Sequence, residues 1–137
     1  MAVSGGCLCG AVRFRSEADP IRTRTCWCRL CQALGGGSAT VNVAFPTEGF
    51  AVEGQTADYV STADSGAVMH RRFCPKCGTP MFSEAEPRPH LIFVRAGALD
   101  DPEIAAPTAT IWTASAPRWA AFDPAIPQFE GQPPPVA

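Results

Sequence analysis

The sequence predicts a mostly β domain, and three observations support this prediction. Short segments that alternate apolar and polar residues, as half-buried strands do, recur along the chain. The 12 glycines and 14 prolines interrupt the chain too often for long helices. A length of 137 residues allows one hydrophobic core but not two. We therefore expect a single domain of antiparallel sheets.

The expected strands are short and bounded by turn residues. The segment from Ala11 to Arg15 alternates apolar and charged side chains, and Thr40 to Phe45 alternates similarly until Pro46 ends it. A turn is expected at Asp64-Ser65-Gly66, between two later strands. The remaining strands are predicted at 50–53, 57–60, 68–73, 91–96 and 108–113.

Helix signals are weak and the C-terminal end is rich in proline. One short helix is expected around Leu30 to Leu34, ended by three glycines. After Phe122 the prolines become frequent, and the chain ends Gln132-Pro-Pro-Pro-Val-Ala137. We therefore expect residues 1–129 to form the domain and residues 130–137 to form a loose tail.

Charge and hydropathy exclude some classes of function. The net charge is −2 and the pI is about 5.6, which disfavours nucleic-acid binding. No apolar run approaches the roughly 20 residues that span a bilayer, so we expect no membrane insertion. The first seven residues lack the basic start and apolar stretch of a signal peptide, which predicts a cytoplasmic protein. Thiols stay reduced there, so clustered cysteines indicate metal binding or catalysis rather than disulfides.

The seven cysteines fall into three groups, and the last group is the most specific. They are Cys7-Leu-Cys9, Cys26-Trp-Cys-Arg-Leu-Cys31 and Cys74-Pro-Lys-Cys77. In the last group the proline favours a tight turn and Gly78 lets the backbone fold back toward a metal, which is the pattern of a zinc knuckle. A structural zinc site needs two further thiolates.

Cys7 and Cys9 can supply those two thiolates. Residues i and i+2 of a strand share a face, and the glycines around the pair let the backbone bend. We therefore predict a four-thiolate zinc site on Cys7, Cys9, Cys74 and Cys77. Buried core thiols or a redox pair are the alternatives.

Cys26, Cys28 and Cys31 then remain as a local trio. Three protein ligands with an open fourth position are typical of a catalytic zinc. Zinc binds sulfur well, so the open position suits a substrate thiolate that attacks a small electrophile. A second structural zinc with a distant fourth ligand, or a site emptied by oxidation, is the alternative. Spacing also permits other partitions, such as Cys7 and Cys9 with Cys26 and Cys28.

Four segments together resemble one known family. They are Gly6-Cys-Leu-Cys-Gly-Ala-Val-Arg-Phe14, the Cys26-x-Cys-x-x-Cys31 group, Phe73-Cys-Pro-x-Cys-Gly-Thr79 and Ile111-Trp-Thr-x-Ser115 followed by Trp119. They are similar to the glutathione-dependent formaldehyde-activating (GFA) family, also called the centromere protein V domain. The resemblance extends from Gly5 to about Phe129.

The resemblance implies a fold, two metal sites and an activity. The fold is a β-tent of small antiparallel sheets held by zinc. Two zinc ions per chain are implied, a structural ion on the four cysteines and a catalytic ion on the trio. The implied activity joins formaldehyde to the thiol of glutathione, a reaction classed with carbon–sulfur lyases. Three positions depart from the family pattern, namely Trp27, Gln32 and Thr110.

Other residues have weaker signals. His70 is a candidate fourth ligand on the strand that leads to Cys74, although an ordinary surface histidine is the commoner outcome; His90 is given no role. Arg13, Arg15, Arg22, Arg24 and Arg29 are a candidate basic rim for a substrate with carboxylates, although charged residues more often face solvent. The three tryptophans, Trp27, Trp112 and Trp119, are expected in the core or in a pocket wall.

Two functions follow from these expectations. The first is a zinc enzyme that acts on a carbon–sulfur bond of a small thiol adduct, with glutathione as the expected thiol. The second is a non-catalytic zinc module for partner binding or scaffolding. The open trio favours the enzyme, whereas a protein side chain that closes the second zinc would favour the module.

Overall fold

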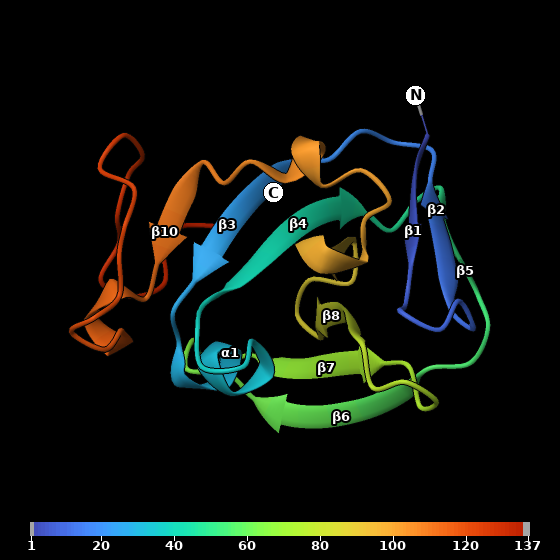
Figure 1. Cartoon of the computed structure of the whole chain (residues 1–137), viewed down its shortest axis with the longest axis horizontal. Coiled ribbons are helices and arrows are strands. Elements are labelled where there is room, and N and C mark those ends of the chain that lie inside the picture. The colour runs from blue at the N-terminus through green and yellow to red at the C-terminus, as the bar shows by residue number, and fades with distance from the viewer. Residues whose placement is uncertain (1, 136–137) are drawn as a thin grey trace.

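The computed structural model describes residues 2–135 and is built from two sheets (Figure 1). The smaller sheet is antiparallel and has the order β1-β2-β5. Its strands are β1 (Val3–Gly6), β2 (Arg13–Ser16) and β5 (Phe50–Glu53). In β2 the charged Arg13 and Arg15 face out and Phe14 faces in, as the alternation predicts.

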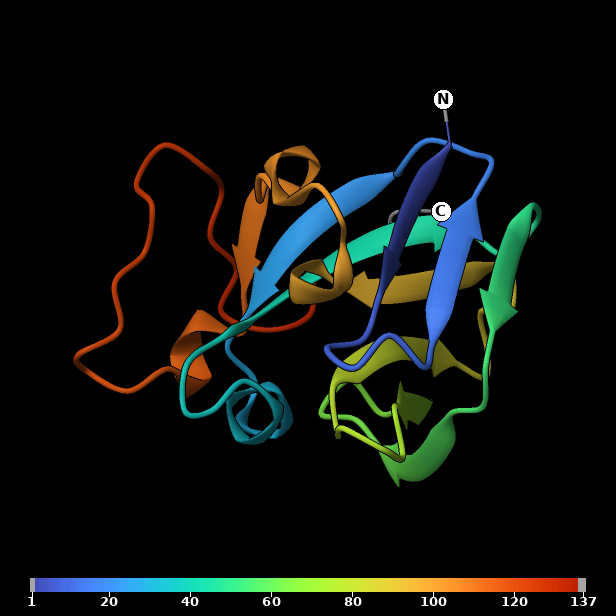
Figure 2. The same ribbon diagram turned by 45° about the vertical axis from the view of Figure 1, so that its right-hand side comes forward.

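The larger sheet has seven strands in the order β10-β3-β4-β9-β8-β7-β6. All neighbours are antiparallel except β10 and β3, which run parallel. Figures 1 and 2 show the sheet bent, so that β3 and β4 lie on one side and β6 and β7 on the other. The bounds are β3 (Arg22–Cys26), β4 (Thr40–Pro46), β6 (Ala57–Thr62), β7 (Val68–Phe73), β8 (Pro80–Ala85), β9 (Leu91–Arg95) and β10 (Ala109–Ile111).

Helical structure is sparse in residues 2–135. The one α-helix is α1 (Arg29–Leu34), and its N-cap is Cys28, whose sulfur accepts a hydrogen bond from the backbone N–H of Cys31. Three 3-10 turns complete the structure, η1 (Ala96–Ala98), η2 (Pro102–Ala105) and η3 (Thr113–Ser115).

An aromatic cluster joins the two sheets. Phe14 stacks on Phe50 with ring centroids 5.4 Å apart, and both rings meet Phe82 of the larger sheet edge-on. Phe45 completes the cluster from β4. Aromatic rings bury large areas and favour edge-on packing, so this cluster fixes one sheet against the other.

The mostly β prediction is confirmed, with some corrections. The strands at 50–53 and 68–73 and the turn around Gly66 lie where the sequence predicts them. Three strands, β1, β3 and β8, were not predicted. The larger sheet is also wider than expected and includes a parallel pair. The sequence of β10 carries no signal for this pairing, which forms because the chain crosses over before it returns beside β3.

The segment 130–135, which we name the C-terminal strap, is not loose. The backbone N–H groups of Trp112 and Ala114 donate to the carbonyls of Gly131 and Glu130, and Pro133 is buried. The strap is therefore bound to the segment after β10 and, through the Pro134 carbonyl, to Arg24 of β3. The expectation of a loose tail is therefore wrong for 130–135, whereas residues 136 and 137 lie outside the described residues. Within 2–135, no helix has the length and hydropathy to cross a bilayer.

Candidate metal centre

Cys7, Cys9, Cys74 and Cys77 converge in one cluster. Their sulfurs all lie within 4.8 Å of one another, and the Cys7–Cys9 and Cys9–Cys74 pairs are 3.7 Å and 3.8 Å apart. Four sulfurs bound tetrahedrally at about 2.3 Å from zinc are about 3.8 Å from each other, so the cluster fits that geometry. The two halves come from different sheets, since Cys7 and Cys9 follow β1 and Cys74 and Cys77 follow β7.

Tight turns aim backbone and hydroxyl donors at these sulfurs. The N–H of Val12 donates to Cys7 Sγ at 3.2 Å, and the N–H of Cys77 donates to Cys74 Sγ at 3.4 Å. The Thr79 hydroxyl lies 3.1 Å from Cys77 Sγ. Together with the backbone N–H of Thr79, this contact lowers the pKa of Cys77 to about 5. Such donors favour thiolates, which are the metal-binding form of cysteine.

The reason given for the convergence of Cys7 and Cys9 needs correction. The two residues lie in a turn after β1, not on one face of a strand. The turn is closed by a hydrogen bond from Gly10 N–H to the Cys7 carbonyl, and Gly10 has a φ of 81°. Glycine tolerates this left-handed conformation, so the turn rather than strand periodicity brings the sulfurs together.

The trio of Cys26, Cys28 and Cys31 forms a second cluster at the junction of β3 and α1. Its three sulfurs also lie within 4.8 Å of one another, and all three residues are buried. Cys26 ends β3, Cys28 caps α1 and Cys31 lies in the first turn of the helix. The two predicted clusters are thus both formed, and the alternative partition with Cys7 and Cys9 is not.

The three thiols of the trio titrate as one coupled group. Hydrogen bonds from Cys26 and Cys28 lower the pKa of Cys31, and the Thr40 hydroxyl and the charge of Arg95 act in the same direction. Hydrogen bonds with Cys28 and Cys31, followed by burial, raise the pKa of Cys26. Cys31 is therefore the favoured thiolate of the group. A soft divalent cation that displaces the remaining protons would fit this donor set.

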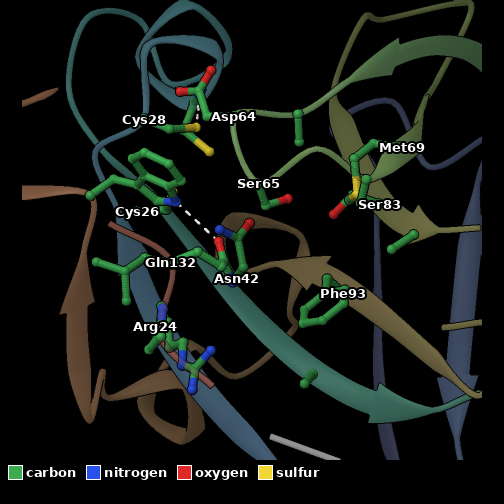
Figure 3. Close-up of a pocket in the computed structure, with 18 of the residues that line it drawn as sticks. Arg24, Cys26, Cys28, Asn42, Asp64, Ser65, Met69, Ser83, Phe93 and Gln132 are labelled. Atoms are coloured by element: carbon green, nitrogen blue, oxygen red, sulfur yellow. Dashed lines mark hydrogen bonds between the residues drawn. The ribbon is translucent and has the colours of Figure 1, made fainter. Parts of the chain in front are cut away.

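The trio faces a cavity with a volume of about 360 Å³. This volume is in the range of small-molecule sites. The floor is one face of the larger sheet, with residues from β3, β4, β9, β8 and β7. Figure 3 shows Cys28 toward one end of the cavity and Arg24 toward the other, with Asn42 and Gln132 between them.

The predicted basic rim is only partly formed. Arg22 and Arg24 line the cavity. The other three predicted arginines do not, because Arg13 pairs with Asp100, Arg15 pairs with Glu17 and Arg29 donates to Gln32. Instead, three arginines that sequence reasoning did not single out complete the cavity, namely Arg71, Arg88 and Arg95.

Arg95 is an arginine whose charge acts on the trio. It is mostly buried, its guanidinium donates to Asn42 Oδ1, and it interacts with Cys31 and Cys26. Burial lowers its pKa, whereas the thiolate charge of Cys31 raises it. No sequence motif marks Arg95 or Asn42. Their register is the only signal, because Asn42 pairs with Arg24 on one side and with Arg95 on the other.

The three departures from the family pattern do not line this cavity. The ring of Trp27 packs edge-on against Trp119 and Phe122. The side-chain amide of Gln32 donates to the carbonyls of Trp27 and Ser115, so this residue ties α1 to the segment after β10. Thr110 is buried within β10. All three act on packing around the trio rather than on the cavity wall.

Trp112 combines an unusual backbone with a place in the cavity wall. It has a φ of 59°, a left-handed conformation that non-glycine residues rarely adopt. The C-terminal strap holds it there, since its backbone N–H donates to Gly131 and its indole N–H donates to Gln132 Oε1 at 3.0 Å. The strained residue therefore lies where the strap meets the cavity.

His70 is not a fourth ligand of either cluster. Its Nδ1 lies 2.6 Å from Asp58 and its Nε2 lies 2.8 Å from Glu86. The hydrogen bond with Asp58, followed by that with Glu86, raises the pKa of His70. Both ring nitrogens are occupied in this way, which leaves neither free for a metal.

Two known proteins are similar to this chain. A Halomonas elongata protein named "Putative glutathione-dependent formaldehyde-activating enzyme" is 29% identical over 105 residues, which cover 73% of this chain and 67% of that protein. The crystal structure of a Rhodobacter sphaeroides protein superposes with a TM-score of 0.54, covering 91% of this chain and 98% of the other. At 18% identity, that likeness establishes a shared fold.

The family comparison covers most of the chain. The sequence profile of the glutathione-dependent formaldehyde-activating enzyme family matches residues 2–115. The match includes every cysteine of both clusters and ends before the C-terminal strap. The chain belongs to the glutathione-dependent formaldehyde-activating enzyme family.

Proposed function

We propose that the chain is a cytoplasmic zinc enzyme that forms or splits a carbon–sulfur bond on a small thiol, with formaldehyde and glutathione as its expected reactants. One observation supports this most directly. The Cys26–Cys28–Cys31 trio faces a cavity of about 360 Å³, whereas none of the other four cysteines lines this cavity. A trio that contacts a small-molecule cavity is the arrangement an enzyme needs and a purely structural site does not.

Zinc is the metal that the donor sets fit. Four converging sulfurs would hold a structural ion on Cys7, Cys9, Cys74 and Cys77, and the trio would hold the second ion. A zinc ion on the trio would keep a bound thiol deprotonated and nucleophilic at neutral pH. Its three thiolate ligands make it a weak Lewis acid, so activation of sulfur is the chemistry it would favour.

The reaction forms one bond and moves one proton. The sulfur of the thiol adds to the carbonyl carbon of formaldehyde, the carbon–oxygen double bond becomes single, and the oxygen takes up a proton to give a hydroxymethyl thioether. The chain's own residues bind and orient the reactants. The sheet face and the C-terminal strap restrict access of water to the trio, and the cavity arginines attract anionic groups of the thiol.

The test must separate catalysis from the spontaneous reaction. Exchange NMR with carbon-13-labelled formaldehyde and glutathione measures how fast the adduct forms and breaks at equilibrium. We expect the zinc-loaded protein to increase this exchange rate in proportion to its concentration. The Cys28→Ser variant should lose the increase, whereas Arg13→Gln, which alters an exposed arginine paired with Asp100, should retain it.

The non-catalytic zinc module is the competing outcome. It would be indicated if the protein bound two zinc ions per chain and the exchange rate stayed at its spontaneous value with glutathione. In that case the cavity would serve recognition only.

A further inference from the structure

The cavity carries an excess of positive charge. Five arginines contribute to its lining, Arg22, Arg24, Arg71, Arg88 and Arg95, against a single carboxylate, Asp64. No ion pair involves any of the five within residues 2–135. Grouped cations in a concave, partly desolvated site repel one another unless an anion joins them. The charge distribution therefore suits an anionic ligand.

Three of these arginines also have buried hydrogen-bond donors without partners. Arg24 Nε, Arg88 Nη2 and Arg95 Nε are inaccessible to solvent and make no hydrogen bond in the described structure. A buried donor left unpaired costs stability, and arginine donors match carboxylates particularly well. The charges of Arg22 and Arg88 both act on Arg24, so these three form one group at the Arg24 end of the cavity.

Strand register gives this group a defined distance from the trio. Arg22, Arg24 and Cys26 are alternate residues of β3, so their side chains share the face that forms the cavity floor. Two residues of a strand span about 7 Å, so Arg24 lies about 7 Å and Arg22 about 13 Å along the strand from Cys26. Figure 3 shows Arg24 and Cys28 toward opposite ends of the cavity.

The C-terminal strap positions this group from the other side. Arg24 Nη2 donates to the carbonyl of Pro134 at 3.3 Å, and Gln132, Pro133 and Pro135 line the cavity. The strap follows the part of the chain that matches the family, residues 2–115. The strap therefore adds part of the cavity wall from outside the matched region.

We propose that Arg24, assisted by Arg22 and Arg88 and held by the C-terminal strap, is the specificity-determining residue that binds a carboxylate of the substrate. The inference rests on the proposed function for the thiol end of the ligand. It identifies the substrate class as thiols whose carboxylate lies at least about 7 Å from the sulfur. A peptide-length thiol such as glutathione meets this requirement, whereas mercaptoacetate, with its carboxylate one carbon from the sulfur, does not.

Binding of S-methylglutathione tests the proposal without any reaction. This probe has no free thiol, so it neither forms the adduct nor offers a thiolate to zinc, but it keeps both carboxylates. Calorimetry should detect binding to the zinc-loaded protein, and Arg24→Gln should weaken it by about 10- to 100-fold. The matched control Arg13→Gln should bind as the parent does. Thermal melting confirms that both variants fold.

Two further measurements make the result specific. The glutathione diester lacks the free carboxylates. When Arg24 is changed to Gln, the fold-loss of affinity for this diester should be at least about tenfold smaller than the fold-loss for S-methylglutathione. A chain ending at Gly131 should weaken binding as well, and its effect should not add to that of Arg24→Gln, because both remove one coupled contact.

The outcomes separate this proposal from the proposed function. Equal binding of S-methylglutathione by Arg24→Gln and Arg13→Gln, or no binding by the parent protein, would overturn the carboxylate site. A tight, Arg24-dependent complex with no increase in the exchange rate would leave the carboxylate site standing and overturn the proposed enzyme.

Discussion

The two cysteine clusters are built from similar ligands but occupy different kinds of place. The four-cysteine cluster joins a turn after β1 to a turn after β7, so it links the smaller sheet to the larger one across 65 residues of sequence. The trio lies within six residues, at the end of one strand and the start of one helix. Cross-links that close long loops stabilise a fold most, so the first cluster is suited to structure.

The more exposed of the two clusters is not the one that faces the cavity. Cys9 is exposed and Cys77 is half-buried, whereas all three residues of the trio are buried. The trio faces the cavity and not the outer surface, so under the proposed function the cavity would bring substrate to it. Predictions that separate the two clusters must therefore measure stability and activity independently.

The largest expected effect is the loss of the fold on substitution in the four-cysteine cluster. Cys74 is fully buried between the two sheets, and structural zinc contributes folding free energy directly. We expect Cys74→Ser to remove most of the free energy of unfolding, which is about 5–15 kcal/mol for ordinary domains. Thermal melting and zinc analysis of the purified protein measure this. An unchanged melting temperature with full zinc content would show that the cluster is not structural.

The second largest effect is expected in the trio, where substitution should reduce activity strongly and stability only slightly. Cys28→Ser should reduce the enzyme's contribution to formaldehyde–glutathione exchange by at least about 100-fold. It should cost only about 1–3 kcal/mol of stability, since α1 keeps its other contacts and serine can still cap the helix. Exchange NMR and urea unfolding on the same sample measure both quantities. Unfolding as complete as that of Cys74→Ser would make the trio a second structural site.

The contrast between these clusters also explains how far the sequence could be interpreted. Both clusters are predictable because cysteine is scarce and its spacing is constrained by metal geometry. The alternation in β2 and the position of β7 are equally predictable from the sequence. Strand β3 was missed because Arg22-Thr-Arg-Thr has no apolar alternation, since Arg22 and Arg24 line the cavity instead of a core. Strand β8 was missed because it opens with Pro80.

The cavity itself was mostly beyond sequence reasoning. Arg95, Asn42 and Arg24 become neighbours through strand pairing between β3, β4 and β9, which no local pattern specifies. The strap was expected to be loose because prolines cannot continue a helix or a central strand. Its carbonyls nevertheless accept hydrogen bonds, and proline retains that acceptor.

A smaller effect is expected at Gly78, which follows Cys77 in the four-cysteine cluster. Gly78 has a φ of 78°, and its N–H donates to the Cys74 carbonyl, which closes the turn that presents Cys77. Gly78→Ala should cost about 1–2 kcal/mol because alanine is strained in this conformation, and zinc should become easier to extract from this cluster. Gly97→Ala is the matched control, since a Cβ there meets no atom within 4 Å and its φ is not positive. Urea unfolding and chelator titration compare them; an equal stability of the two variants would contradict the role of the turn.

The smallest effect concerns His70, on the strand that leads into Cys74. Its contacts with Asp58 and Glu86 raise its pKa in the folded state, so the protonated form is favoured by folding. The stabilisation is therefore fully present below the unfolded pKa of about 6.5 and is lost as pH rises through the higher folded value. His70→Gln should lower stability in mildly acidic buffer and leave it nearly unchanged at about pH 9. Urea unfolding at both pH values measures the difference in stability between the parent and the variant. The titration of the cysteines affects both proteins equally and cancels in this difference. Zinc content should stay at two ions per chain in this variant, because neither ring nitrogen faces a cluster. Loss of one zinc on this substitution would instead make His70 the ligand that closes the trio, and it would remove the main difference between the two clusters.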